Sequence, residues 1–335
     1  MDDWLTAAPK LLTAAPAVLV TVAIVEGSVP REPGAKMLVT AAGFAGTIGG
    51  GHLEHRAIEI ARAMLNEGGQ PKLERFALGP SLGQCCGGIA HLAFEVADRD
   101  QMALLDARRN VDTVRVVAFD DAAWALFDGS GRHIAGGAVP AFDRAAGTHV
   151  FLDADGRRWL ADAVLAPRAH LMLFGAGHVG AAIVRALAEL PCRVTWVDER
   201  DDLFPADVPS NVTIEATDIP EALAEQAAPG TTFLVMTHSH ALDLRLSNAI
   251  LSRPGRDWFG LIGSDTKRRQ FEHRLRERGI GADKIDAMVC PIGLPGIAGK
   301  APAVIAASCA AQLLTVWEAQ ETRAASHPEV SPESN

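Results

Sequence analysis

The sequence predicts an α/β protein of two domains, in which an α+β half precedes a doubly wound parallel sheet. Three observations predict this. The chain has 335 residues, enough for two domains of roughly 150 residues each. Short alternating strands separated by Asp-Gly turns fill residues 111–164, which is typical of antiparallel hairpins. From His170 onward, strands alternate with amphipathic helices, the pattern of a parallel sheet covered by helices.

Composition and charge exclude several classes of protein. The chain is 48% apolar and 21% charged, as in folded globular proteins, and its net charge of −10 without a basic run argues against nucleic acid and membrane partners. The acidic start Met1-Asp2-Asp3-Trp4 is unlike a signal peptide, and the longest apolar stretch, 14–25, is too short to cross a bilayer. We therefore expect a cytoplasmic protein whose five cysteines are reduced thiols.

The N-terminal domain, residues 1–165, is expected to begin with a β-hairpin. Residues 17–26 are β-branched and apolar, and a Gly/Pro-rich link separates them from a second strand at 37–40. Gly49-Gly50-Gly51 then opens a helix whose apolar residues recur at helical spacing as far as Gly68. Glycines at a helix start can present backbone N–H groups to an anion, so this segment is a candidate anion cradle.

Two acidic or histidine-rich groups of the N-terminal domain resemble metal sites but are interpreted otherwise. His52, His55 and Glu59 lie at helical spacing and are assigned to the solvent-facing side of their helix. Asp153-Ala154-Asp155-Gly156 lacks the spaced acidic ligands of a calcium loop and is predicted to be a hairpin turn.

The C-terminal domain, residues 166–318, is expected to follow a link near Ala166-Pro167-Arg168. Its predicted strands are LMLF, RVTWV, NVTIE, TFLVM and WFGLI, and its predicted helices end near Leu190, lie near Glu221, span Leu242 to Ser252 and Ser264 to Arg278, and begin near Pro302. Residues 319–335 have little apolar content and two prolines, which indicates a disordered tail.

A glycine motif at the start of this domain indicates a Rossmann-like sheet. Gly175, Gly177 and Gly180 form G-x-G-x-x-G directly after a strand and at the start of a helix, with His178 inside the motif. Such glycines permit a tight turn and close approach of a phosphate to the helix N-terminus. Asp198, which ends the next strand, is placed to accept hydrogen bonds from ribose hydroxyls. Taken alone, the motif predicts an NAD(P)-dependent oxidoreductase.

Further polar residues follow later strands of the same predicted sheet. His238 and His240 come after TFLVM, hence at the carboxyl edge where such sheets bind ligands, and Asp243 follows them. This H-x-H next to an acid could ligate zinc, but hydrogen bonding to an anionic ligand is the preferred interpretation. Ser264 is expected to cap the next helix, and Lys267 is a candidate to pair with a phosphate.

Adjacent cysteines mark a loop in the N-terminal domain. Cys85 and Cys86 follow Gln84 in LGPSLGQCCGG. Neighbouring Cα atoms lie about 3.8 Å apart, too close for an unstrained disulfide. Thiols on a glycine-lined loop suit soft-metal ligation, sulfur handling or redox sensing. Cys192 and Cys309 fall in helical or capping positions and are expected to be inert, whereas Cys290, before Pro291, is left undecided.

Seven motifs occur in one order along the chain. They are GTIGGGHLE (46–54), LGPSLGQCCGG (78–88), LFGAGHVG (173–180), VDERDDLFP (197–205), THSHALD (237–243), GLIGSDTKRRQF (260–271) and CPIGLPGIAGKAPAVIAAS (290–308). In this order, with the GQCCGG element ahead of a Rossmann-like half, the chain resembles the XdhC/CoxI family of xanthine dehydrogenase accessory proteins. The resemblance covers about residues 16–318.

The resemblance implies an accessory protein that binds the molybdenum cofactor, a molybdopterin with a dithiolene and a terminal phosphate. It would hold the cofactor while a NifS-type cysteine desulfurase replaces an oxo ligand with a sulfido ligand, and then deliver it to apo-xanthine dehydrogenase. Molybdenum cofactor biosynthesis proteins are further implied partners, and homodimerisation is open. Because the cargo must be released, we expect modest affinity. The candidate cofactor-binding residues are Gln84, Cys85, Cys86, Gly175, Gly177, His178, Gly180, Asp198, His238, His240, Ser264 and Lys267.

Within this set, roles are divided between the two domains. Cys85 and Cys86 are expected to contact molybdenum or its sulfido ligand, and a glycine loop is expected to take the phosphate. Whether that loop is the one at Gly177 or the cradle at 49–51 is open at this point. The rival functions are an NAD(P)-dependent oxidoreductase using Gly175 and Asp198, and a zinc hydrolase built on His238 and His240.

Overall fold

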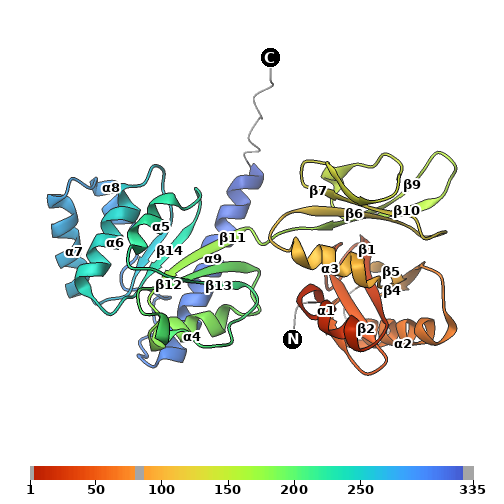
Figure 1. Cartoon of the computed structure of the whole chain (residues 1–335), viewed down its shortest axis with the longest axis horizontal. Coiled ribbons are helices and arrows are strands. Elements are labelled where there is room, and N and C mark those ends of the chain that lie inside the picture. Colours follow the sequence, from red (N-terminus) through yellow and green to blue (C-terminus); the bar gives the residue numbers. More distant parts are fainter. Residues whose placement is uncertain (1–3, 80–86, 327–335) are drawn as a thin grey trace, which may run out of the picture. The chain divides into compact units, whose positions relative to one another are not determined.

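The computed structural model describes residues 4–79 and 87–326. The chain divides into two compact units, Met1–Ala166 and Pro167–Asn335, and the division falls inside the link expected near Ala166-Pro167-Arg168. Each unit contains its own sheets and helices (Figure 1). The α/β fold class and the parallel sheet in the second half are confirmed.

The first sheet of the N-terminal unit has the strand order β3-β2-β1-β5-β4. Its elements, in chain order, are α1 (Trp4–Ala14), β1 (Ala17–Glu26), β2 (Lys36–Thr40), β3 (Phe44–Gly46), α2 (Gly51–Glu67), β4 (Lys72–Ala77), β5 (Ile89–Val96) and α3 (Arg99–Ala107). The predicted hairpin is present, because β1 and β2 pair antiparallel with Leu19 opposite Leu38. The apolar residues of α2 cover one face of this sheet, where Leu53 and Met64 pack with Val20.

The second sheet of the N-terminal unit has the order β8-β7-β6-β10-β9. Its strands are β6 (Thr113–Ala118), β7 (Trp124–Asp128), β8 (His133–Gly136), β9 (His149–Leu152) and β10 (Arg158–Val164). Neighbouring strands pair antiparallel, as the alternating pattern and Asp-Gly turns predict. The predicted hairpin turn at Asp153 is present, with the Asp153 carboxylate accepting from the backbone N–H groups of Asp155 and Arg157.

Buried ion pairs join the two sheets of this unit. The Lys36 ammonium on β2 lies 2.7 Å from Asp162 on β10, and Arg115 on β6 pairs with both Asp162 and Glu95 on β5. Lys36, Arg115 and Asp162 are buried. Buried charges are tolerated when each is paired, so these contacts specify how the two sheets pack.

The C-terminal unit is a parallel sheet with the order β13-β12-β11-β14-β15. Its elements are β11 (Ala169–Phe174), α4 (His178–Leu187), β12 (Cys192–Asp198), β13 (Val212–Ala216), α5 (Pro220–Gln226), β14 (Thr232–Val235), α6 (His240–Ser252), β15 (Phe259–Leu261), α7 (Asp265–Glu277), α8 (Ala282–Ala287) and α9 (Pro302–Ser326). Alternate residues of β11 enter different cores, Leu173 toward α4 and α9 and Phe174 toward α6. The central strand is thus buried on both faces, as in doubly wound sheets.

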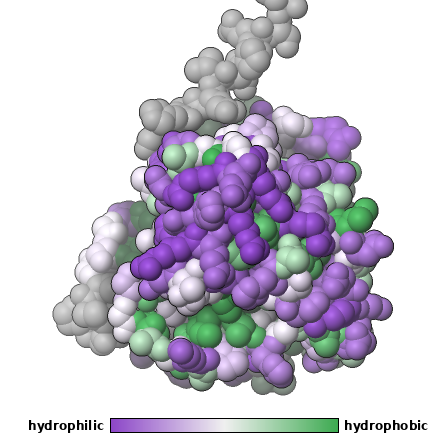
Figure 2. All heavy atoms as spheres, turned by 90° about the vertical axis from the view of Figure 1, so that its left-hand side faces the viewer, coloured by the Kyte–Doolittle hydropathy of each residue, from purple (hydrophilic) through white to green (hydrophobic). Residues whose placement is uncertain are grey.

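The strand order places the switch point of the sheet beside β11. The chain moves outward through β12 and β13 on one side, then crosses to β14 and β15 on the other. The crevice at the carboxyl ends of the strands next to such a point is where these sheets bind ligands. On another side of this unit, which includes α7 and α8, the surface is mostly hydrophilic (Figure 2).

The last helix extends further than the sequence indicates. α9 continues to Ser326, so residues 319–326, assigned above to a disordered tail, are helical. This stretch, AQETRAAS, lacks Gly and Pro and consists largely of good helix formers, which continue a helix already anchored by its buried part. By length and composition alone, Pro302–Arg323 could cross a membrane. Its residues Cys309, Leu313 and Trp317, however, pack in the core beside α4.

Candidate functional site

The loop between β11 and α4 contains three glycines, of which packing requires two and leaves the third unconstrained. Gly175 has φ of +123°, and a Cβ there would collide with the carbonyl oxygen of Met236. A Cβ at Gly180 would collide with the carbonyl oxygen of Gly175, which accepts a 3.0 Å hydrogen bond from the Trp196 indole. At Gly177 the φ is −72° and a Cβ would meet open space. Gly177 therefore fits close approach of a ligand to the backbone.

The N-terminus of α4 offers free donors beside Gly177. Gly177 is the N-cap residue and supplies no side-chain hydrogen bond, and the helix ladder begins with the Ala181 N–H donating to the Gly177 carbonyl. Gly177 and His178 are exposed. The N–H groups of the first turn and the positive end of the helix dipole are thus available to an anion such as phosphate.

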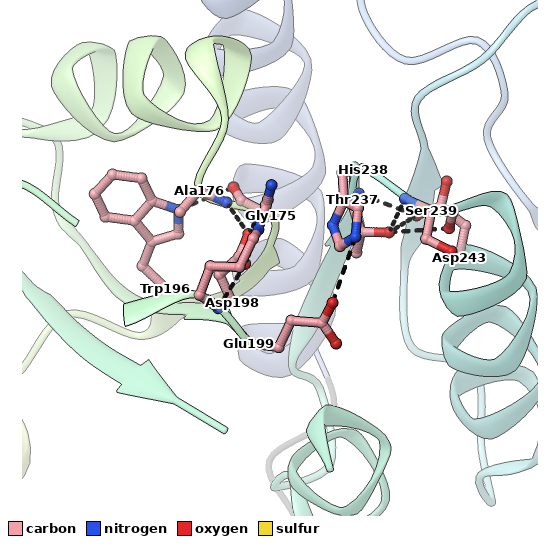
Figure 3. A network of polar contacts seen from close by, with 10 residues as sticks. Gly175, Ala176, Trp196, Asp198, Glu199, Thr237, His238, Ser239 and Asp243 are labelled. Atoms are coloured by element: carbon pink, nitrogen blue, oxygen red, sulfur yellow. Dashed lines mark hydrogen bonds and ion pairs between the residues drawn. The ribbon is translucent and has the colours of Figure 1, made fainter. Parts of the chain in front are cut away.

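Asp198 is already fully hydrogen-bonded within the protein. Its carboxylate accepts from the Ala176 backbone N–H at 2.7 Å (Figure 3). It also accepts from Arg200 three times, through the backbone N–H at 3.0 Å and two guanidinium nitrogens at 2.9 Å. Burial by itself would raise the pKa of Asp198, but these hydrogen bonds outweigh it and lower the pKa. A carboxylate has about four acceptor sites. The expected role for Asp198 as an acceptor for ribose hydroxyls therefore has no free acceptor in this structure.

A small pocket lies at the switch point next to this loop. Its lining residues are Phe174, Val197, Asp198, Glu199, Pro220, Thr237, His238, Leu242 and Leu246. The space inside it that a water molecule can enter is about 10 Å³, roughly one water site. At its rim, the His238 imidazole lies 3.4 Å from the Glu199 carboxylate (Figure 3). The pocket is therefore too small to enclose a ring system.

Beyond His238, the loop after β14 is held by a buried acid. Asp243, fully buried on α6, accepts from the Thr237 backbone N–H at 3.0 Å and hydroxyl at 2.7 Å. Its second oxygen lies 2.6 Å from the Lys267 ammonium, which also donates to the Ile262 carbonyl at 2.8 Å. Lys267 was expected to pair with phosphate, but it is buried and neutralises Asp243 instead. The sequence did not reveal this pair because the two residues meet only through the packing of α6 and α7.

The remaining predicted residues of this edge have local roles. Ser264 caps α7, its hydroxyl accepting from the Lys267 backbone N–H at 3.4 Å, as expected. His240 is exposed at the start of α6, with its ring 6.5 Å from that of Phe271. Across residues 4–79 and 87–326, no group of three or more His, Cys, Asp or Glu side chains is arranged to hold a metal ion. The zinc site considered for His238 and His240 therefore lacks further ligands in that part of the chain.

The candidate anion cradle of the N-terminal unit is filled by a side chain of its own. One carboxylate oxygen of Glu54 accepts from the Thr47 hydroxyl at 2.7 Å and from the backbone N–H groups of Ile48 and Gly50, each at 3.2 Å. Glu54 thus takes the place that an external anion would occupy. A glutamate in the first turn of a glycine-led helix is the signal for such a contact. Of the two glycine segments, the one at Gly177 has the free helix N-terminus.

The remaining predicted residues are the histidines of α2 and the cysteines. His52, His55 and Glu59 are exposed on the solvent-facing side of α2, as expected. Cys192 and Cys309 are buried, and burial raises their pKa to about 11 and about 12, which keeps both thiols protonated. Burial likewise raises the pKa of Cys290 to about 11. The predicted positions Gln84, Cys85 and Cys86 lie outside the described residues.

Comparisons with known proteins agree with this architecture. The model of the XdhC and CoxI family matches residues 11–77, and that of the XdhC Rossmann domain matches residues 171–313. An Escherichia coli K12 protein named YqeB, described as uncharacterised, is 31% identical over 155 residues, which cover 44% of this chain but 27% of YqeB. The chain thus spans only about a quarter of that relative.

A solved structure extends the likeness to nearly the whole chain. A Bacillus halodurans protein, described as a xanthine dehydrogenase, has a TM-score of 0.72 and 21% identity, covering 95% of this chain and 96% of that one. This similarity shows a common fold. With family models matching in both units, in the order that the motifs predict, the chain belongs to the XdhC and CoxI family.

Proposed function

We propose that this protein is a maturation factor for a molybdoenzyme, which binds molybdopterin and delivers it to apo-xanthine dehydrogenase. Membership of the XdhC and CoxI family supports an accessory role rather than a turnover enzyme. In this proposal the protein works in the cytoplasm. A NifS-type cysteine desulfurase sulfurates the cofactor while it is held, and molybdenum cofactor biosynthesis proteins supply it.

One observation carries the choice of ligand. The loop combines a free α4 N-terminus and an open Gly177 with an Asp198 that is already satisfied by Ala176 and Arg200. Such a loop can hold a terminal phosphate, because backbone N–H groups and the helix dipole favour an anion. Asp198, the acid expected to bind the ribose of a nicotinamide dinucleotide, has no free acceptor there. A pterin carrying a phosphate needs the first feature and not the second.

The other end of the cofactor is assigned to the thiols. Thiolates are soft ligands suited to molybdenum and its sulfur, so Cys85 and Cys86 are proposed to contact that end. Release to the dehydrogenase requires that this contact be weak enough to exchange. We therefore expect modest affinity rather than permanent ligation.

Direct cofactor retention tests this proposal. The purified protein is incubated with molybdenum cofactor and gel-filtered, and molybdenum and pterin are measured together. We expect both in about one-to-one amount with protein, and we expect Cys85→Ala or Cys86→Ala to lower the retained molybdenum. Cys192→Ala removes a buried thiol and serves as the control. If neither loop substitution alters uptake or transfer, the thiol assignment is wrong.

The nicotinamide alternative has a separate readout. If the loop binds NADH or NADPH, the fluorescence of the dinucleotide is quenched or blue-shifted in a saturable manner at micromolar protein. Because Asp198 is occupied by internal donors, we expect no saturable change. Saturation would favour an oxidoreductase and contradict the carrier.

A further inference from the structure

Helix α7 carries a basic face on a protein that is acidic as a whole. Residues 265–278 contain six Lys or Arg and three Asp or Glu, whereas the whole chain contains 31 of the former and 41 of the latter. α7 follows the edge strand β15 and lies at one side of the C-terminal unit (Figure 1). Hydrophilic side chains predominate on that side of the unit (Figure 2). This helix therefore has a local charge opposite in sign to the net charge of the chain.

Three exposed arginines at this helix have no acidic partner. The side chains of Arg269, Arg274 and Arg278 are exposed, and no carboxylate in the described part of the chain forms an ion pair with them. Glu272, on the same helix, is used internally, because its carboxylate pairs with Arg268 at 2.8 Å. The three guanidinium groups are thus available to carboxylates of another molecule, which Arg binds through two parallel N–H donors.

The stability of the helix explains only part of this charge. Cations in the last turn interact favourably with the helix dipole, which accounts for Arg274 and Arg276. Arg269 lies in the second turn, nearer the positive end of the dipole, where a cation gains no stabilisation from it. Arg269 is also exposed and makes no ion pair that would hold it in the fold. Folding therefore gives no reason for a cation at this position.

The chemistry of the face fits an acidic protein surface better than a nucleic acid or a lipid bilayer. Phe271, the phenylalanine of α7, is buried and offers nucleic acid bases no ring to stack on. Of the large apolar side chains exposed in the described part of the chain, none belongs to α7, so this helix lacks the apolar face that enters a membrane. Charges beyond about 8 Å are screened at physiological ionic strength, so a docked acidic surface interacts with α7 rather than with the net charge of the chain.

The position of α7 relates this face to the candidate site. α7 begins directly after β15, and α4 begins directly after β11, in the same parallel sheet. Both helices therefore start at the carboxyl edge of that sheet, where the proposed function places the cofactor. Charged contacts at a polar surface mainly accelerate association and leave dissociation fast. Such a contact suits a carrier that must leave its partner after each delivery.

We propose that Arg269, Arg274 and Arg278 form a docking surface for an acidic region of the apo-xanthine dehydrogenase that receives the cofactor. The assignment rests on the proposed function for the identity of the partner, and it adds the surface through which that partner is recognised. Because the contacts are exposed charges, their effect belongs mainly to the association rate constant and depends on salt.

Association kinetics test the surface. The full-length protein is passed over immobilised apo-xanthine dehydrogenase in surface plasmon resonance. We expect the association rate constant to fall at least about tenfold when NaCl is raised from about 20 mM to about 500 mM. Arg269→Glu/Arg274→Glu should lower it at least about tenfold at the lower salt concentration. Arg269→Lys/Arg274→Lys keeps the charge and should remain within about twofold of the wild type.

A control with the same change in net charge separates this surface from a general charge effect. Arg56→Glu/Arg157→Glu reverses two exposed arginines of the N-terminal unit and should remain within about twofold of the wild type. Melting temperatures confirm that the variants fold. An unchanged rate constant in Arg269→Glu/Arg274→Glu, or an equal loss in the control, overturns the assignment.

Cofactor retention separates this assignment from the proposed function. Arg269→Glu/Arg274→Glu should retain molybdopterin in gel filtration as the wild type does. If the wild type retains no molybdopterin but docks through α7, the carrier function is lost and the docking surface stands. If it retains molybdopterin but does not bind the dehydrogenase, or uses α7 to bind a NifS-type cysteine desulfurase instead, the docking assignment is wrong and the carrier function stands.

Discussion

Gly177 differs from Gly175 and Gly180 because the fold does not require a glycine at this position. Gly175 and Gly180 are required by the loop itself, because a Cβ at either would collide with a backbone carbonyl. Gly177 has an ordinary φ and open space around it, so other residues fit the fold there. A larger residue would instead occupy the volume in front of the α4 N–H groups. We therefore expect a substitution at this glycine to remove the proposed binding without damaging the unit.

Substitution of Gly177→Asp should therefore keep or slightly increase the stability of the fold and abolish the proposed phosphate binding. Asp is a favoured N-cap residue, and its carboxylate would accept from the free N–H groups of α4. We expect the free energy of unfolding to stay equal or to increase by a few tenths of a kcal/mol, while phosphate-dependent retention of molybdopterin is lost. Gly177→Ala, which adds volume without charge, should give an intermediate loss. Full retention in Gly177→Asp would contradict a phosphate at this helix end.

Lys267 differs from Gly177, because its charge stabilises the fold by pairing with the buried Asp243. Its side chain is 10% exposed, and its partner Asp243 is 1% exposed. Lys267→Met leaves Asp243 buried without its cation, so we expect a loss of about 3–5 kcal/mol in the free energy of unfolding, measured by urea denaturation. Arg269→Met on the exposed side of α7 is the control and should change stability by less than about 0.5 kcal/mol. Weaker phosphate binding at unchanged stability would instead make Lys267 a ligand.

Helices α2 and α4 both start after glycines, but they differ in which groups hydrogen-bond to their N-termini. The start of α2 is closed by Glu54, which accepts from Thr47, Ile48 and Gly50. The first turn of α4 contains no such acid. The nearby Asp198 accepts a hydrogen bond from the Ala176 N–H, and its other acceptor sites are occupied by Arg200. The same local chemistry thus gives a closed structural cap in one unit and a helix N-terminus without a side-chain cap in the other.

Strand β11 carries a histidine that makes stability depend on pH. Burial, together with the charge of Arg193, lowers the pKa of His170 from 6.5 to about 4. Below pH 6.5 the unfolded chain binds a proton that the folded protein takes up only near pH 4, so stability is lost as the pH falls through this range. His170→Gln should lose less stability between pH 7 and pH 4 in urea denaturation. His273→Gln, exposed on α7, should behave as the wild type does.

For the whole molecule, the two units have separate cores. The buried apolar clusters of the N-terminal unit contain residues up to Val164, and those of the C-terminal unit begin at Ala169. Each unit is large enough to bury a core of its own. We therefore expect each unit to fold by its own contacts.

Separate expression tests this independence. Residues 1–166 and 167–335 should each give a folded protein with a cooperative unfolding transition in circular dichroism. An unfolded C-terminal fragment would show that its stability depends on the N-terminal half.

The sequence by itself determined the architecture and indicated a candidate site. Periodicity distinguished antiparallel hairpins from a parallel sheet, because residue spacing directly reflects which face of a strand or helix is buried. The glycine spacing located the loop at Gly175 and Gly177, since a tight turn and close backbone approach need glycine at those places. Cys85 and Cys86 stay a prediction from sequence alone.

Only the tertiary structure decided which polar groups are available. Asp198, Lys267 and the glycine cradle at Gly50 all have the residue types of ligand-binding groups, yet internal partners satisfy each of them. Those partners lie up to 24 residues away along the chain, so local spacing does not reveal them. Whether a charged side chain binds a ligand or holds the fold depends on what packing places next to it. At Gly177, packing leaves the α4 N-terminus without a side-chain cap.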